Sequence, residues 1–153
     1  MTGVAGRECS SLVGDRDFIA VLQPLFQMSA PEVSFLWDNE RSWHRILVKS
    51  LDQLSDRPMF SANRLVVSAV STERPYQLTR AELRILTYMI GCPSNEAIAL
   101  ALGISQRTVH SHVANVLTKM GCERRTQAVV RAVRYSLFRP EAHPLASLAY
   151  LAA

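Results

Sequence analysis

The sequence predicts a mostly α-helical protein with a small N-terminal α or α+β module and a four-helix C-terminal domain. Helix-capping residues and glycines alternate through residues 79–121 and divide that stretch into three short helices. Pro75 marks the boundary between the two parts, because proline disfavours helix at the preceding residue and cannot donate a backbone hydrogen bond. We therefore place the module at 1–75, the domain at 76–139 and a tail at 140–153.

The predicted helices of the C-terminal domain cover residues 80–90, 95–102, 106–120 and about 125–137. Thr79 lies three residues before Glu82, which is the spacing of a capping box. The expected caps of the second and third helices are Ser94 and Ser105. Glycine follows each of the first three helices and proline follows the fourth, at Gly91, Gly103, Gly121 and Pro140.

The second and third helices are joined by a very short turn that contains Gly103. Two helices joined in this way cannot run in line and must cross steeply, which is the helix-turn-helix arrangement. The apolar residues of the third helix recur at helical spacing, so we expect one buried face made by Val109, Val113, Val116 and Met120.

Composition favours a folded protein of the cytoplasm. Apolar residues make up 48% of the chain and charged residues 20%. No apolar run approaches the roughly 18–20 residues of a membrane span, and the N-terminus lacks the apolar core of a signal peptide. Three scattered cysteines are a poor disulfide framework. We expect a cytoplasmic protein with no membrane partner.

The basic charge is concentrated in residues 76–139. This segment has nine Lys/Arg against three Asp/Glu, a net charge of +6, whereas residues 1–75 have eight against nine, a net charge of −1. Glu141 supplies the remaining −1, which gives +4 for the whole chain. A compact segment with such an excess is typical of a surface that meets phosphate.

Two histidines lie one residue apart in the third predicted helix. At 100° per residue, His110 and His112 flank the apolar face on opposite sides and point about 160° apart, so they cannot share a metal within this helix. No CxxC or HxxxH pattern accompanies them, and no Ser, Cys or acid lies at a spacing typical of a catalytic triad. We expect no metal, no cofactor and no enzymatic activity.

Residues 78–135 resemble the four-helix DNA-binding domain of the LuxR (GerE-like) family of bacterial transcription regulators. The resemblance runs without gaps at consistent spacing. The matching residues are Leu78-Thr79, Glu82, Leu86, Gly91, Ser94-Asn95, Ile98-Ala99, Leu102, Ile104-Ser105, Thr108-Val109, His112, Lys119, Gly121, Arg125-Thr126 and Ala128.

This resemblance implies that the third helix lies in the DNA major groove, with His110, Ser111 and Ala114 toward the bases. Arg107, Thr108 and Asn115 would lie nearer the phosphates. Arg125 would contact a phosphate or another helix, and His112 would either pack or contact a phosphate. The complete set of expected DNA-binding residues is Ser105, Arg107, Thr108, His110, Ser111, Ala114, Asn115, Lys119 and Arg125.

The chain departs from the family pattern at several positions of this surface. His110 stands where the family usually has lysine, and Ala114 offers at most an apolar contact to a thymine methyl group. Ala81 replaces an arginine, and Glu96-Ala97 replaces a Lys-Glu pair. These changes suggest weaker or differently specified DNA binding. They leave open an alternative in which the same surface binds RNA polymerase or another regulator without reading bases.

The fourth helix is expected to contribute either to the core or to a homodimer. Val129, Val133 and Leu137 recur at i, i+4 and i+8, which by default indicates a core face. In LuxR-type domains the fourth helix commonly pairs with its twin, so the resemblance implies dimerisation through these residues and a pseudo-palindromic DNA site. Cys92 and Cys122 are expected to be small buried apolar residues.

The first 75 residues give weaker patterns. We expect a helix at 17–27, bent or ended by Pro24, then a longer helix from about 31 to 54 and a short strand at 64–70. Trp37, Asp38 and Trp43 are candidates for a small-ligand site, although an aromatic pair on one helix is more often core. A phosphoreceiver would need more residues and an acidic cluster. A dimerisation or partner-docking module is favoured.

Overall fold

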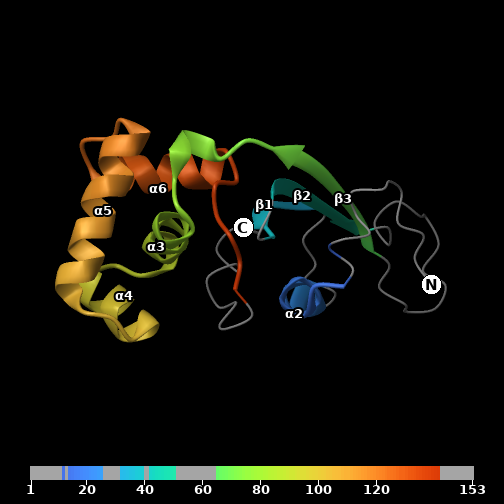
Figure 1. Cartoon of the computed structure of the whole chain (residues 1–153), viewed down its shortest axis with the longest axis horizontal. Coiled ribbons are helices and arrows are strands. Elements are labelled where there is room, and N and C mark those ends of the chain that lie inside the picture. The colour runs from blue at the N-terminus through green and yellow to red at the C-terminus, as the bar shows by residue number, and fades with distance from the viewer. Residues whose placement is uncertain (1–11, 13, 26–31, 40–41, 51–64, 142–153) are drawn as a thin grey trace. The chain divides into compact units, whose positions relative to one another are not determined.

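The computed structural model describes residues 12, 14–25, 32–39, 42–50 and 65–141 (Figure 1). The chain divides into two compact units: Met1–Glu73 with Pro140–Ala153, and Arg74–Arg139.

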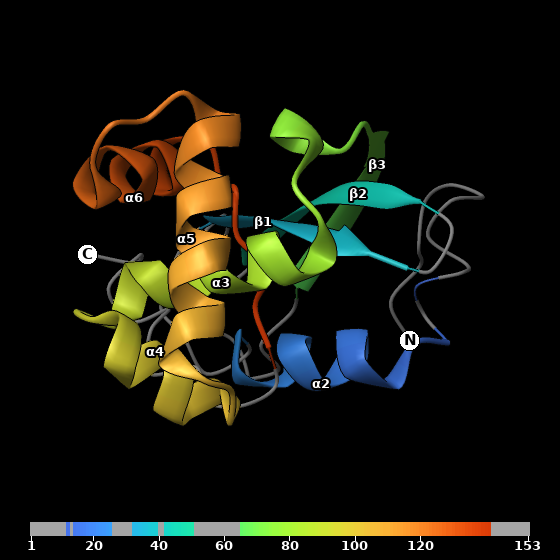
Figure 2. The same ribbon diagram turned by 60° about the vertical axis from the view of Figure 1, so that its left-hand side comes forward.

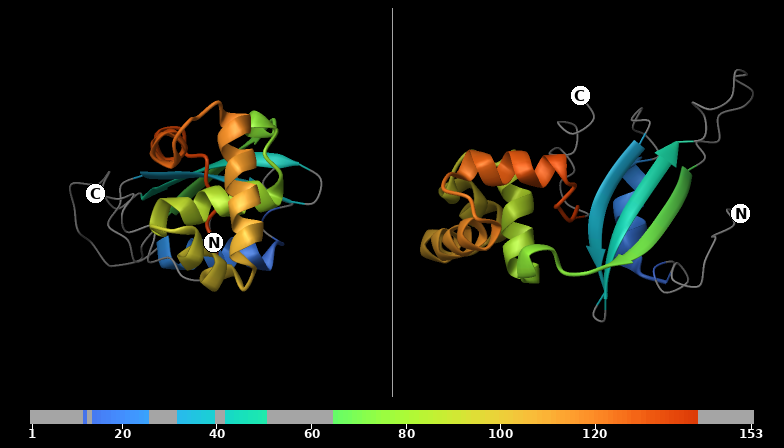
Figure 3. Two further views of the ribbon diagram at one scale, coloured as in Figure 1. Left: turned by 90° about the vertical axis from the view of Figure 1, so that its left-hand side faces the viewer. Right: turned by 90° about the horizontal axis from the view of Figure 1, so that it is seen from above.

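The first unit contains one helix and an antiparallel sheet. The helix is α2 (Arg16–Leu25), and the strands β1 (Glu32–Asp38), β2 (Trp43–Ser50) and β3 (Leu65–Thr72) lie in the order β1-β2-β3. Figure 3 shows α2 along one face of the sheet. That face holds the core, since the Phe18 and Trp37 rings meet edge to face with centroids 5.2 Å apart.

Asp15 joins the helix to the sheet. One carboxylate oxygen accepts hydrogen bonds from the backbone N–H groups of Asp17 and Phe18, at 3.0 and 3.2 Å, and so caps the start of α2. The other oxygen accepts from the indole N–H of Trp37 on β1, at 3.1 Å. A single carboxylate therefore begins the helix and fixes the largest buried side chain of the unit.

The expected long helix from 31 to 54 is wrong. Residues in this range form β1 and β2 instead, with Phe35 opposite Ile46 and Trp37 opposite His44. The apolar spacing that suggested a helix arises because successive residues of β1 are buried, from Phe35 through Asp38. The other two expectations are close: the helix at 17–27 is observed at Arg16–Leu25, and the strand at 64–70 at Leu65–Thr72.

The second unit contains one short 3-10 turn and four helices (Figure 2). The elements are η2 (Pro75–Gln77), α3 (Arg80–Gly91), α4 (Asn95–Leu102), α5 (Gln106–Met120) and α6 (Arg125–Arg134). The first three predicted helices are confirmed to within one residue. The fourth ends earlier than the expected 137, because Ser136 takes a left-handed backbone conformation with φ 52°.

The predicted helix caps are confirmed. The Thr79 hydroxyl accepts from the Glu82 backbone N–H at 3.2 Å, and the Glu82 carboxylate accepts from the Thr79 N–H at 2.7 Å. Ser94 and Ser105 cap α4 and α5 through their side-chain oxygens. Gly103 adopts the left-handed conformation after α4, with φ 64°, which permits the tight turn into α5.

The apolar face of α5 is buried as predicted, and it forms the core with residues of α3, α4 and α6. The buried residues include Leu83, Leu86, Ile98, Val109, Val113, Val116, Met120, Ala128 and Ala132. Within the described ranges, no single helix is long and apolar enough to cross a membrane; α3 and α4 reach that length and composition only together, across a 120° bend.

Candidate nucleic-acid interface

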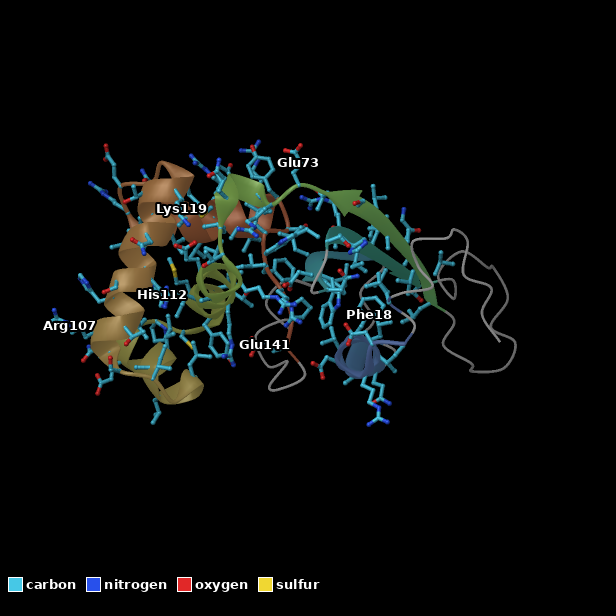
Figure 4. The ribbon with its side chains drawn as sticks, in the orientation of Figure 1. Phe18, Glu73, Arg107, His112, Lys119 and Glu141 are labelled. Carbon is cyan, nitrogen blue, oxygen red and sulfur yellow. The ribbon has the colours of Figure 1, made fainter. Side chains whose placement is uncertain are left out.

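Six exposed residues lie along the outward side of α5, and we call them the α5 outer face. They are Arg107, Thr108, His110, Ser111, Ala114 and Asn115. The burial of Val109, Val113 and Val116 on the opposite side fixes this orientation, since these valines have exposed fractions of 9% or less. Figure 4 shows Arg107 extending away from the helices.

The side chains of the α5 outer face differ in how firmly they are held. The Ser111 hydroxyl donates to the Arg107 carbonyl at 3.1 Å, which leaves its oxygen free to accept a further hydrogen bond. The hydroxyls of Ser105 and Thr108 lie 2.7 Å apart and bond to each other at the start of α5. Within the described part of the chain, the Arg107 guanidinium and the His110 ring have no hydrogen-bond partner or ion pair and remain available to a ligand.

Lys119 is engaged inside the domain. Its ammonium group donates to the Glu82 carboxylate at 2.6 Å and to the Gln77 carbonyl at 3.1 Å. Burial raises the pKa of the Glu82 carboxyl, but the hydrogen bonds from Lys119 and Thr79 lower it further, so that the pKa lies below its ordinary value. The sequence pattern placed Lys119 in the DNA-binding set, whereas its contacts hold the end of α5 to the start of α3.

Arg125 makes the inter-helix contact that was one of its two expected roles. Its guanidinium donates to the carbonyls of Cys92 and Met89, at 2.7 and 3.4 Å, and to the Asn95 side-chain oxygen at 3.2 Å. Burial lowers the pKa of this guanidinium below its ordinary value, although the electrostatic effect of Cys92 acts in the opposite direction. Arg125 thus satisfies carbonyls at the end of α3, which have no partner within the helix.

Arg131 is a structural residue that the sequence pattern did not reveal. Its guanidinium donates to the carbonyl of Met120 at the end of α5. A basic side chain at a helix C-terminus is favourable, but here it comes from a different helix, eleven residues along the chain. Lys119, Arg125 and Arg131 together form a set that we call the structural cations of the domain.

The predicted dimerisation stripe on the fourth helix needs a correction. Leu137 lies beyond the end of α6 and is buried, with an exposed fraction of 3%, so it cannot share an exposed helical face with Val133. The core residues of α6 are Ala128 and Ala132. Val129 is half-buried and Val133 is 40% exposed. Dimerisation through these two valines stays a prediction.

The three candidate ligand residues of the first unit do not lie on one helix, as was expected. Trp37 and Asp38 are on β1, and Asp38 faces Trp43 on β2. Trp37 has an exposed fraction of 0% and is a core residue, while Trp43 is half-buried. A ligand role for these residues stays a prediction.

Cys122 is buried as expected, and Cys92 is half-buried; both are free thiols. Within the part of the chain that the structure describes, no group of three or more His, Cys, Asp or Glu side chains is placed to hold a metal ion.

Residues 76–132 match a family model described as "Bacterial regulatory proteins, luxR family". Three relatives match part of this chain. An uncharacterised transcriptional regulatory protein, YhcZ of Bacillus subtilis, is 49% identical over 65 residues, which cover 42% of this chain and 30% of YhcZ. DegU of Brevibacillus brevis is 36% identical over 89 residues, covering 58% of this chain and 38% of DegU. VraR of Staphylococcus aureus is 40% identical over 62 residues, covering 40% and 30%.

The chain therefore spans between 30% and 38% of the length of these relatives. Among solved structures, VqmA bound to DPO aligns with a TM-score of 0.39 and 16% identity, over 89% of this chain and 64% of that chain. A score this low gives no functional information.

Proposed function

We propose that this chain, whose residues 76–132 are a helix-turn-helix domain of the luxR family of bacterial regulatory proteins, is a DNA-binding transcriptional regulator. The observation that supports this best is the α5 outer face, where Arg107 and His110 have no partner in the described structure. Two relatives, YhcZ and DegU, are named as transcriptional regulatory proteins. A regulator of this kind acts in the cytoplasm, where the DNA is.

In this proposal α5 lies in the major groove. Its 15 residues span about 22 Å, and the groove is wide enough to admit one helix. Arg107 is at the first turn, where it reaches a phosphate or a guanine edge. His110 and Ser111 then meet base edges, and Ala114 meets a thymine methyl group. Ser105 and Thr108 fix the start of the helix rather than contact bases.

The structural cations reduce the charge that is available to DNA. Lys119, Arg125 and Arg131 bond to carbonyls or to Glu82 within the domain. The net charge of +6 for residues 76–139 therefore overstates the number of phosphate contacts that this surface makes. We expect affinity to fall with salt through a small number of contacts, since each contact contributes about 0.9 to the slope of log affinity against log salt.

A second candidate function is docking to RNA polymerase or another regulator through the helix-turn-helix surface. It is favoured by Leu100 on α4, an apolar side chain with an exposed fraction of 86%. Isolated exposed apolar residues are common on protein surfaces, so Leu100 supports protein docking less strongly than the α5 outer face supports DNA binding. DNA binding remains the primary proposal, with homodimerisation as part of it.

The test is selection from a pool of random DNA duplexes by the full chain, followed by fluorescence anisotropy on the enriched sequence at several salt concentrations. We expect an enriched motif, and we expect Arg107→Ala to weaken binding by about tenfold and to lower the salt slope by about 1, because one phosphate or base contact is lost.

Arg16→Ala is the matched control, because Arg16 is an exposed arginine on α2 in the other unit. It should leave affinity and slope unchanged. Absence of an enriched motif, or an equal loss in both variants, would count against DNA reading by α5 and in favour of protein docking.

A further inference from the structure

The outer edge of β3 has no strand beside it among the described residues. β2 pairs with β3 along all eight residues, from Trp43 opposite Thr72 to Ser50 opposite Leu65. The sheet order places β3 at one end, and Figure 3 shows it as the last strand of the sheet. Every edge strand presents a row of backbone N–H and C=O groups that can pair with another strand.

The sequence of β3 lacks the devices that normally protect such an edge. Residues 65–72 read LVVSAVST and contain no charged residue, no proline and no glycine. The pairing with β2 is continuous and has no bulge. Edges that stay exposed usually carry lysine, proline or a bulge, which oppose pairing with another chain. The composition of β3 thus favours an edge that is paired in the working protein.

Two valines project from the same face of this edge strand. Val66 and Val70 have exposed fractions of 42% and 64%, and they lie opposite Lys49 and Arg45 of β2. Ser68 lies midway between them on the same face and is also exposed. Val66 and Val70 are each two residues from Ser68, so a two-fold rotation about Ser68 exchanges the positions of the two valines.

We propose that β3 pairs antiparallel with β3 of a second copy of this chain, about a two-fold axis through Ser68. In this register Val66 of each copy lies opposite Val70 of the other, and Val67 lies opposite Ala69. A two-fold axis normal to the sheet keeps the same face of the sheet exposed in both copies. Residues that pair across the axis must then lie on the same face, so the axis passes beside a residue and not between two residues. Among the registers centred on a residue of β3, only the one centred on Ser68 places both Val66 and Val70 opposite a valine.

The symmetry of the strand favours a second copy over another partner. Apolar β-branched pairs directly across an antiparallel ladder are stabilising, and this register makes two of them. It sets no like charges opposite each other, since the strand has none. The paired sheet would have six continuous strands, with roughly six to eight new backbone hydrogen bonds. The inference does not depend on DNA binding by α5.

The test is disulfide trapping of the full chain in the absence of DNA. Residues that face each other across the axis have Cα atoms about 4.5–5.5 Å apart, which suits a disulfide. Ser68→Cys should therefore form a covalent dimer under mild oxidant. Ser71→Cys is the matched control, because Ser71 is an exposed serine of the same strand. Its two copies would lie about 20 Å apart in the proposed register.

A second measurement uses charge. Val66→Lys/Val70→Lys and Val66→Glu/Val70→Glu should each be monomeric by light scattering, with a dimer dissociation constant raised at least about tenfold. Mixing the two variants should restore a dimer, because opposite charges then face each other. Circular dichroism checks that both variants fold.

Equal trapping of Ser68→Cys and Ser71→Cys would overturn the proposal, as would a monomeric wild-type chain. A dimer that survives both charge variants but is lost in Val133→Lys would also overturn it, since α6 would then be the interface. None of these outcomes bears on DNA affinity, which is measured separately.

Discussion

The contacts that stabilise the inside of each unit differ between the two units. In Arg74–Arg139, long basic side chains reach from one helix to the carbonyl groups or carboxylate of another, as Arg125 does at the end of α3 and Lys119 does at Glu82. In the first unit, backbone hydrogen bonds between the strands and apolar contacts stabilise the fold. Asp15 adds a polar contact between the helix and the sheet.

The difference shows how misleading a count of charges is for the helical unit. A basic residue in the helical unit either stabilises the fold or is available to bind a ligand, and its contacts distinguish these two roles. Lys119, Arg125 and Arg131 stabilise the fold, while Arg107 on the same scaffold points outward. Substitutions should therefore separate the units by stability, and should separate the two kinds of basic residue by function.

The largest effect is expected for Arg125→Ala. Its loss leaves the carbonyls of Cys92 and Met89 without their donor, which should lower the free energy of unfolding of the helical unit by about 2–3 kcal/mol. Thermal unfolding followed by circular dichroism at the helix signal measures this. Both tryptophans of the chain, Trp37 and Trp43, are in the first unit, so their fluorescence transition should stay unchanged.

Arg134→Ala is the control for this substitution. Arg134 is exposed at the end of α6, and its guanidinium lies 5.8 Å from the centre of the Tyr135 ring. An exposed contact of this type is worth about 0.5–1 kcal/mol, so the helix transition should move little. Equal shifts for the two arginines would show that the Arg125 contacts are not what stabilises the unit.

Asp15→Ala is expected to destabilise the first unit and to leave the helical unit unchanged, which is the reverse of Arg125→Ala. This change removes the cap of α2 and the partner of the Trp37 indole, and should cost the first unit about 1–2 kcal/mol. The tryptophan fluorescence transition should move to lower temperature while the helix transition of the other unit is retained. Asp17→Ala, an exposed position on the same helix, is the comparison. A loss of both transitions together would mean that the units do not unfold separately.

A smaller effect is expected from acid. The pKa of Glu82 is lowered in the folded state, so the ionised carboxylate stabilises the helical unit above the ordinary pKa of 4.5. This contribution is lost as the pH falls below 4.5 and through the folded pKa. In Glu82→Gln the helical unit should be less stable near neutral pH, and its stability should depend less on pH in that acid range.

Denaturant unfolding at a series of pH values measures this, with Glu96→Gln as the control because Glu96 is exposed on α4. A pH dependence in Glu82→Gln as steep as in the wild type would show that another carboxyl group is responsible.

The smallest effect is expected for His110→Lys. It adds a cation to the α5 outer face, where the exposed ring of His110 has no hydrogen bond or ion pair to lose within the described structure. DNA affinity should rise by about two- to fivefold at moderate salt, the salt slope should steepen by about 0.9, and stability should not change. Gln23→Lys adds the same charge on α2, where it should have no such effect.

The helical unit could be predicted because its signals are local. Thr79 and Glu82 are three residues apart, and Ser105 lies two residues after Gly103, so the caps and ends are visible in any short window of sequence. The contacts that give Lys119 and Arg125 their structural roles join residues 30 to 42 positions apart. No local pattern reveals these contacts. The family resemblance placed Lys119 among the DNA-binding residues and left Arg125 with either a phosphate or an inter-helix contact.

Strands β1 and β2 could not be predicted for the same physical reason, whereas the strand at 64–70 could be predicted from its own residues. Residues 43–50 are a strand because they pair with 32–38 on one side and with 65–72 on the other, and neither pairing is visible in a short window of the sequence. The apolar positions from Phe35 to Leu47 satisfy helical spacing equally well. Asn39 and Ser42 were the available signal, since the Asn39 side chain accepts from the Ser42 N–H at 2.8 Å where the chain turns between β1 and β2.

The turn before α3 has a consequence for engineering. Tyr76 and Gln77 are not glycines, yet both hold the left-handed backbone conformation, with φ of 51° and 53°. Such a residue costs on the order of 1 kcal/mol. Glycine at position 77 would keep the carbonyl that Lys119 binds while relieving the clash of the side chain with the backbone. Tyr76 and Gln77 are exposed, and neither belongs to the α5 outer face. A stabilising substitution in this turn would raise the free energy of unfolding, and that gain would offset the cost of destabilising substitutions on the α5 outer face.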